Sequence, residues 1–323
     1  MQNKKIIIAG GSGFIGQYFS DCFGKDNEII ILTRKKIHPG YNDQEDKSKN
    51  NSIQHINWDG KSKADWMKEI EGADLLINLS GKSVNCRYTP KNKKEIFDSR
   101  TNATNILGYA IQQCIHPPKL WINAASATIY RNATDRPQDE YTGEYENDFS
   151  VQVCKKWEKV FYDQNTPHTR KVALRMTIVL GDGGVMVPYL NLLKFGLGGR
   201  QGSGKQMYSW VHIEDVARCV DWIYDHEELT GSFNCAAPNP INNELFMQKL
   251  RRATGHKFGL PAETWMLKIG AGIIGTETEL ILKSRWVIPT KLLESGFNFK
   301  FPELEHAFQN IIENIPRKSY HLF

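Results

Sequence analysis

Three glycines near the start of the chain, spaced three residues apart, have the pattern of a phosphate-binding turn. Gly10, Gly13 and Gly16 follow the apolar run Ile6–Ala9 and overlap a helical pattern that begins at Phe14. In such a turn one glycine permits the tight bend, one lets the backbone approach a pyrophosphate, and one lets the helix pack close to the strand. The free N–H groups and the positive end of the helix dipole then face the phosphates. Because the strand and the helix that this motif requires flank it, we predict dinucleotide binding.

The residues after a second predicted strand, Glu28–Leu32, bear on which dinucleotide binds. An NAD-specific site has Asp or Glu there to hold the ribose hydroxyls, whereas this chain has Thr33 and Arg34, followed by two lysines. A guanidinium group suits the 2′-phosphate of NADP. We therefore predict NADP(H) as the cofactor, with a solvated basic loop as the alternative.

Side chains that carry hydroxyl groups follow a fifth predicted strand, Leu120–Ala124. They include the small Ser126 and the aromatic Tyr130. Ligands of open α/β sheets bind outside the carboxyl ends of the strands. We therefore expect Ser126 and Tyr130 to lie at the ligand site.

Further elements are needed to place these groups. Ser80 and Gly81 form a small-residue turn whose backbone could contact the second ribose, and the polar residues Ser99, Arg100 and Thr104 share one face of a helix that opens at Thr89. A solvated face is the alternative for those three. The expected elements are strand Ile53–Trp58, whose end can lie beside an adenine, helix Ala64–Ile70, strand Asp74–Leu79, helix Thr89–Cys114, helix Phe149–Tyr162, strand Val172–Val179, a helix opening at Trp210–Asp215, and strand Gly231–Cys235.

The alternation of strands and helices predicts an α/β fold, a doubly wound parallel sheet of Rossmann type, with a smaller and mainly helical C-terminal domain. A length of 323 residues fits such a pair. We assign residues 1–180 and about 205–235 to the dinucleotide-binding domain. Residues of about 181–204 and 236–323 form the C-terminal, substrate-type domain.

Composition excludes several classes of function. The net charge of +5 is spread over interspersed lysines and acids, so no basic stripe indicates nucleic acid or an anionic membrane. The six cysteines lack any Cys-x-x-Cys pair and fall mostly in apolar segments, which predicts reduced, buried thiols, no metal site and a cytoplasmic protein. No apolar run is long enough to span a bilayer. A homodimer is left open.

The motifs together resemble the extended or atypical branch of the short-chain dehydrogenase/reductase superfamily, in particular its epimerase-like, YfcH-type family with a small C-terminal domain of unassigned role. The resemblance rests on the glycine turn, Arg34, the Asn78–Gly81 run, Ser99–Arg100 with Thr104, and Ser126 with Tyr130. It extends through Trp157–Glu158, Gly202–Gly204, Ser209–His212 with Asp215, and Val287–Pro289 near the C-terminus.

The resemblance implies an NADP-binding Rossmann domain and a set of site residues. Ser126 and Tyr130 are the implied catalytic residues, since Ser126 matches the serine that bonds the reacting carbonyl or hydroxyl. For Tyr130 the alternative is an aromatic ring that packs near the cofactor, because Thr134 stands where a lysine four residues further on would be. The implied cofactor-binding residues are Gly10, Ser12, Gly13, Phe14, Ile15, Gly16, Thr33, Arg34, Trp58, Leu79, Ser80, Gly81, Arg100, Thr104 and Arg175.

The chain also departs from the superfamily pattern. Catalytic members carry a Tyr-x-x-x-Lys pair on the helix after the fifth strand, where this chain has Ser150 and Cys154. Ser80 replaces the alanine of the usual Leu-Ala-Gly turn, and Arg131–Asn132 replaces a glycine-bearing segment. Two functions therefore stay open: an NADP(H)-dependent oxidoreductase or epimerase acting on an unknown small substrate, or a non-catalytic, regulatory NADPH-binding protein.

Overall fold

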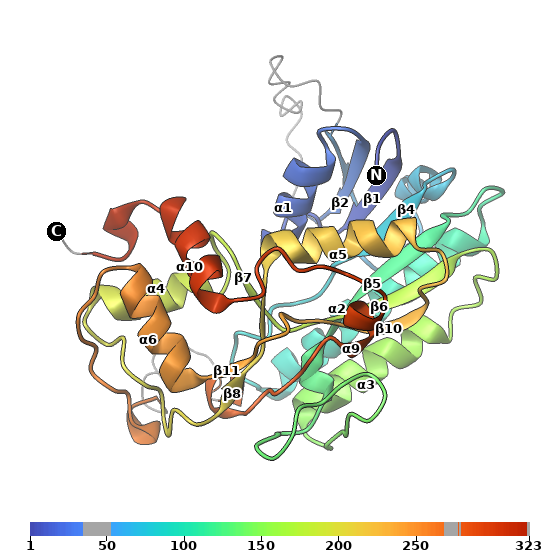
Figure 1. Ribbon diagram of the computed structural model, residues 1–323. Coiled ribbons are helices and arrows are strands. Elements are labelled where there is room, and N and C mark those ends of the chain that lie inside the picture. The colour runs from blue at the N-terminus through green and yellow to red at the C-terminus, as the bar shows by residue number, and fades with distance from the viewer. Residues whose placement is uncertain (35–52, 268–276, 278, 322–323) are drawn as a thin grey trace.

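The centre of the molecule is a parallel sheet of seven strands in the order β10-β6-β5-β4-β1-β2-β3 (Figure 1). The computed structural model describes residues 1–34, 53–267, 277 and 279–321. The strands are β1 (Lys5–Ala9), β2 (Glu28–Thr33), β3 (Ile53–Asn57), β4 (Leu75–Asn78), β5 (Leu120–Ser126), β6 (Arg170–Met176) and β10 (Gly231–Cys235). The strand order reverses between β1 and β4, which is the point where open α/β sheets bind ligands.

Apolar side chains on both faces explain why β1 is central. Ile6 and Ile8 pack into a core cluster on one face of the sheet, and Ile7 and Ala9 pack into a second cluster on the other face; all four are fully buried. A strand covered on both faces needs a continuous apolar run rather than an alternating one.

Helices cover the two faces of the sheet. The first cluster includes side chains from α1 (Phe14–Phe23) and α5 (Ile213–Asp225). The second includes side chains from the 3₁₀ segment η1 (Asp65–Ile70), α2 (Pro90–Gln112) and α3 (Phe149–Tyr162). A further 3₁₀ turn, η2 (Ala127–Ile129), follows β5.

A smaller, mainly helical lobe has its own core. Its main helices are α4 (Met186–Lys194), α6 (Asn243–Ala253) and α10 (Leu304–Glu313), which lie together beside the sheet in Figure 1. The remaining elements are β7 (Ile178–Leu180), β8 (Met207–Tyr208), β9 (Trp210–His212), β11 (Ile241–Asn242), α8 (Glu279–Leu282), α9 (Thr290–Glu294) and η3 (Arg317–Ser319). The predicted doubly wound fold with a helical C-terminal part is confirmed. The domain boundaries at 180/181, 204/205 and 235/236 stay a prediction.

One C-terminal segment returns to the sheet. Leu292 of α9 and Phe297 are buried in the first core cluster, and α9 contacts β10. Both residues lie in the stretch that we assign from sequence to the C-terminal domain, and their side chains pack in the core cluster on one face of the sheet.

Three element predictions were wrong in detail. Trp210–His212 forms strand β9, paired in parallel with β7, so α5 begins only at Ile213 with His212 as its N-cap. The expected strand Val172–Val179 is two strands. Thr177 donates its N–H to the Cys235 carbonyl, and the chain then leaves the sheet so that Ile178 lies opposite Trp210. The expected helix Ala64–Ile70 is a 3₁₀ segment.

The cysteines are less buried than expected. Cys154, Cys219 and Cys235 are buried, but Cys22 is exposed and Cys86 and Cys114 are partly exposed; all six are free thiols. Across the described residues, no helix combines the length and the apolar character that crossing a membrane requires.

Candidate functional site

The three glycines of the first turn each meet a different steric demand. Gly10 has a positive φ of +80°, and a Cβ there would lie 3.0 Å from the backbone N of Ser80. A Cβ on Gly16 would lie 2.4 Å from the Cα of Gly11, so only glycine lets α1 pack this close to the turn. Gly13 is the N-cap of α1, and a Cβ there would have only the Gly10 carbonyl oxygen near it, at 3.6 Å. The backbone at Gly13 is therefore open to a ligand, and the turn fits a pyrophosphate.

The first residues of α1 connect the turn to the rest of the molecule. The Phe14 ring packs against the loop that leads to α4, because a Cβ on Gly183 or Gly184 would lie about 3 Å from it. Ile15 packs against the first core cluster. The first turn of α1 holds no acidic residue, so no carboxylate in that turn neutralises the positive N-terminal end of the helix dipole.

The end of β2 holds the groups predicted to select the cofactor. The Thr33 hydroxyl donates to the Ser12 hydroxyl at 3.2 Å, which joins the end of β2 to the glycine turn. Arg34 is exposed and forms no ion pair within the described ranges. Trp58, predicted to lie at the adenine, is a core residue whose ring packs edge-on against Trp66, with 5.3 Å between the ring centroids.

A buried polar network holds the turn after β4. Ser80 donates its backbone N–H to Asn78 Oδ1 at 3.0 Å, and Asn78 Nδ2 donates to Asn123 Oδ1 at 2.7 Å and to the Thr104 hydroxyl at 3.3 Å. Thr104 also accepts a hydrogen bond from Trp157 Nε1. The Thr104 hydroxyl also donates to the Arg100 carbonyl, so all of its hydrogen-bonding positions are occupied. Thr104 therefore affects the predicted cofactor site by holding Asn78 in place.

Ser80 itself carries an unused polar atom. Its side chain is 9% exposed, and its hydroxyl has no hydrogen-bond partner among the described residues. Leu79, directly before it, donates its backbone N–H to the Ala9 carbonyl. A buried hydroxyl at the junction of β1 and β4 fits a cofactor that supplies the missing partner.

Arg100 lies under the same turn. A Cβ on Gly81 would lie 3.1 Å from its guanidinium carbon, and Nη1 donates to the carbonyls of Lys82 and Ile96 at 3.0 Å each. The Trp157 ring lies 5.1 Å from the guanidinium group. Burial lowers the pKa of Arg100, and no carboxylate within the described ranges pairs with it.

Ser126 and Tyr130 differ in how accessible they are. Ser126 ends β5, is partly exposed, and its Oγ accepts the N–H of Thr128 at 3.2 Å. Tyr130 is completely buried: its hydroxyl donates to Asn234 Oδ1 at 3.0 Å and accepts from Arg175 Nη1 at 2.8 Å. Burial raises the pKa of Tyr130, which Arg175 and Asn234 only partly offset. The phenol is therefore a buried, protonated structural group in this conformation.

Arg175 belongs to the same buried network. Its Nε and Nη2 donate to the two carboxylate oxygens of Glu158 at 2.8 Å each, and both side chains are almost fully buried. The structure thus brings Arg175 to Tyr130 and Glu158. Its predicted contact with the cofactor stays a prediction.

The positions of the missing Tyr-Lys pair lie on α3. Ser150 and Cys154 are both buried, and the Ser150 hydroxyl has no partner among the described residues. Burial raises the pKa of the Cys154 thiol to about 12, so it is protonated at neutral pH. Neither group supplies an acid–base pair.

Sequence reasoning missed Arg285, which comes from the far end of the chain. Its side chain is 16% exposed, its Nη1 lies 3.5 Å from the Tyr130 carbonyl oxygen, and its Nη2 lies 3.9 Å from Glu279 Oε1. Burial lowers its pKa. A single arginine in an irregular segment carries no periodic signal that would have marked it.

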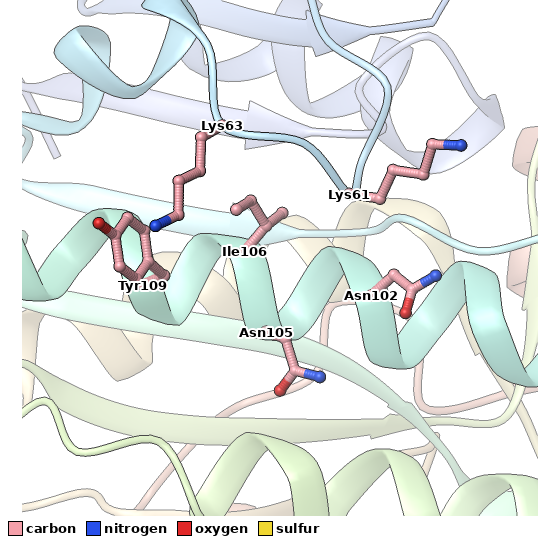
Figure 2. A pocket seen from close by; sticks show the side chains of 6 residues that line it. All are labelled: Lys61, Lys63, Asn102, Asn105, Ile106 and Tyr109. Atoms are coloured by element: carbon pink, nitrogen blue, oxygen red, sulfur yellow. The ribbon is translucent and has the colours of Figure 1, made fainter.

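A separate surface pocket of about 360 Å³ lies where the loop after β3 crosses α2 (Figure 2). Lys63 places its ammonium 3.7 Å from the centroid of the Tyr109 ring. The other lining residues are Lys61, Asn102, Asn105 and Ile106. None of the predicted site residues lines this pocket.

A doubly wound sheet whose first strand ends in a three-glycine turn defines a dinucleotide-binding protein. The chain belongs to the NAD dependent epimerase/dehydratase family, whose model matches residues 6–236; a domain of unknown function, DUF1731, matches residues 264–311. The family-level identification from sequence is thereby confirmed.

Relatives of similar length match along almost the whole chain. The epimerase family protein SSP1921 of Staphylococcus saprophyticus is 33% identical, over 96% of this chain and 99% of its own. The epimerase family protein YfhF of Bacillus subtilis is 30% identical, over 95% and 97%. The crystal structure of the human epimerase family protein SDR39U1 with NADPH superimposes with a TM-score of 0.82 at 28% identity, covering 96% of this chain and 100% of that one.

Proposed function

We propose that this chain binds NADP(H) and acts as an oxidoreductase or epimerase on a small substrate held at Ser126. The observation that supports NADP(H) is at the end of β2. Arg34 is exposed there, directly after Thr33, whose hydroxyl bonds Ser12, and it stands at the position where an acidic residue would favour NAD. The human relative whose structure is described with NADPH supports the same choice.

Each part of the site has a defined task in this proposal. The Gly10–Gly16 turn and the start of α1 hold the pyrophosphate, and Arg34 holds the 2′-phosphate. The bound nicotinamide supplies or accepts a hydride. Ser126 orients the substrate, because the residue is partly exposed and, among the described residues, the one hydrogen bond of its Oγ is the bond accepted from the Thr128 N–H.

A non-catalytic, regulatory role is the second candidate, and α3 favours it. Ser150 and the protonated Cys154 replace the acid–base pair, and both hydrogen-bonding positions of the buried Tyr130 phenol are used. A positioned acid or base contributes roughly 10²- to 10⁴-fold in rate. Turnover towards ordinary alcohols and carbonyls should therefore be slow.

The test combines binding and turnover. Competitive titration should show a preference for NADPH over NADH of roughly 10- to 100-fold, the value of a charge-assisted contact, and Arg34→Ala should abolish it. Equal affinities in the native protein would refute the NADP(H) assignment. A substrate panel read by nicotinamide absorbance then separates the two roles. Turnover lost in Ser126→Ala supports the enzyme, and no turnover with any substrate supports the regulatory role.

A further inference from the structure

The helical lobe contains three segments that carry cations and no acids. They are residues 194–199 at the end of α4, 251–260 at the end of α6, and 317–321 at the end of the described chain. Together they form what we call the basic lobe surface, whose six cations are Lys194, Arg251, Arg252, Lys257, Arg317 and Lys318. No two of the segments are neighbours in the sequence, so the sequence predicts no basic stripe here and only the fold brings the cations together.

Direct contacts join the three segments. Lys194 Nζ donates to the Lys318 carbonyl at 2.8 Å, which ties the end of α4 to η3. The rings of His256 and His321 stack with 4.3 Å between their centroids, and His321 Nε2 lies 2.9 Å from the Thr254 carbonyl oxygen, which ties the end of α6 to the same segment. In Figure 1 the last described residues, drawn in red, lie at the end of the lobe that is turned away from the sheet.

Exposed apolar side chains lie among these cations. Phe195, Phe258 and Leu260 are 66%, 74% and 58% exposed. The Leu260 N–H donates to the Gly196 carbonyl at 2.9 Å, so the segment that carries Phe258 and Leu260 lies against the one that carries Phe195. Each phenylalanine directly follows a lysine of the basic lobe surface. Exposed apolar groups that gather in one place mark an interaction site.

None of the six cations forms an ion pair with a carboxylate in the described part of the chain. The cations just outside the surface do: Arg200 Nη2 lies 2.7 Å from Glu263 Oε1, and Lys249 Nζ lies 2.6 Å from Glu305 Oε1. Glu313, at the end of α10, is the other acid that flanks the segments, and it pairs with none of the six. A surface of this sign repels a second copy of itself and attracts an anionic partner.

We propose that the basic lobe surface binds the face of an anionic lipid bilayer, with Phe195, Phe258 and Leu260 entering the boundary between headgroups and acyl chains. Lysines and arginines near an anionic membrane each strengthen binding, and buried apolar area adds a second attraction. A nucleic acid would also attract the cations and stack bases on the two phenylalanine rings, but it offers no apolar partner to Leu260. None of the predicted cofactor-binding residues lies on this surface, so the proposal goes beyond the proposed function and does not depend on it.

The experiment sediments the full chain with vesicles of phosphatidylcholine alone or of phosphatidylcholine mixed with phosphatidylserine, at low and at high salt. We expect binding to the anionic vesicles only, and weaker binding at high salt because salt screens the charges. Arg252→Gln combined with Lys257→Gln removes two exposed cations and should weaken binding about 25-fold, since each cation near an anionic surface is worth roughly 5-fold. Phe258→Ser, which keeps every charge, should weaken it as well.

Matched variants on the sheet domain control for charge and for apolar area. Lys25→Gln combined with Lys156→Gln removes the same charge from exposed sites, and Ile115→Ser removes a side chain that is 84% exposed; both should bind vesicles as the native protein does. Thermal unfolding checks that every variant folds.

Three results overturn the proposal. The first is no binding, or equal binding to neutral and anionic vesicles. The second is vesicle binding that stays unchanged in the Arg252/Lys257 variant or in Phe258→Ser, or that falls equally in the controls. The third is tighter binding to a DNA duplex at the same salt concentration, lost in the Arg252/Lys257 variant but kept in Phe258→Ser, which would assign the surface to nucleic acid.

Discussion

At the residue scale, burial decides what Tyr130 can do. The phenol donates to Asn234 and accepts from Arg175, so its hydroxyl links β10 to β6. Removing the hydroxyl leaves the buried acceptor Asn234 Oδ1 and the buried donor Arg175 Nη1 without this partner. A hydroxyl with this role contributes to stability whether or not the protein is an enzyme.

Tyr130→Phe should therefore lower the free energy of unfolding by about 1–3 kcal/mol, the cost of unsatisfied buried groups. Chemical denaturation measures the loss, and NADPH binding should persist. An unchanged stability would show that the network relaxes at no cost. Abolished turnover in a stably folded variant would instead return Tyr130 to the catalytic role.

Substitutions at Gly13 and Gly16 should have different effects, the first on cofactor binding and the second on stability. Gly13→Val places its Cβ in ordinary contact with the Gly10 carbonyl oxygen, at 3.6 Å, so the protein should fold but lose NADPH binding, as calorimetry would show. Gly16→Ala forces a methyl group against the Gly11 backbone and should cost about 1–3 kcal/mol of stability or more. NADPH bound by Gly13→Val with native affinity would mean that the pyrophosphate lies elsewhere.

At the element scale, His212 shows how one residue ends a strand and starts a helix. It is the last residue of β9, and its Nδ1 accepts the Glu214 N–H at 3.2 Å as the N-cap of α5. Its ring packs on Phe301, with 3.9 Å between centroids, which ties α5 to the C-terminal segment. Burial lowers the pKa of His212, with the nearby acids only partly offsetting it.

A lowered pKa in the folded state gives His212 a definite effect on stability with pH. In the unfolded chain histidine titrates at about pH 6.5, so the unfolded chain binds the proton more readily than the folded protein does. The free energy of unfolding is therefore highest above that pH and falls as the pH drops below it. Native protein should lose up to about 1.4 kcal/mol per pH unit more than His212→Asn below that pH, since asparagine keeps the cap. Denaturant midpoints from pH 7.5 to 5.5 provide the comparison. Parallel slopes would contradict the assignment.

Local signals explain which elements the sequence could predict. The glycine turn, the Thr89 cap of α2 and both ends of α3 follow from short-range patterns, and the structure has each of them. The separation of β7 from β6 and the pairing of β9 depend on partners more than 30 residues away. The same holds for Arg285, whose place beside Tyr130 is set only when the C-terminal segment folds back.

At the scale of the whole molecule, α9 makes the edge of the sheet depend on the end of the chain. Leu292 is fully buried against the sheet, whereas the next residue, Leu293, is 47% exposed. The two leucines lie on the same short helix, so they separate the effect of core packing from that of helix propensity.

Leu292→Ala should lower the free energy of unfolding by about 2–5 kcal/mol, and Leu293→Ala should change it little. Thermal unfolding followed by circular dichroism and tryptophan fluorescence gives both values. Because Leu292 belongs to the core of the sheet, the whole transition should shift. Equal effects of the two substitutions would show that α9 is not packed as described.

The return of this segment also constrains the order in which the protein is made. The ribosome releases the chain from its N-terminus, and domains generally fold as units during synthesis. Here the first core cluster contains residues from Ile6 to Phe297. This core therefore stays incomplete until Phe297 has emerged, with β10 lacking its contact with α9 until that helix arrives. Between the emergence of β10 (Gly231–Cys235) and that of α9 (Thr290–Glu294), a nascent chain of this protein has to keep that edge from pairing with other molecules, which makes this stretch of translation the step at which chaperones would matter most.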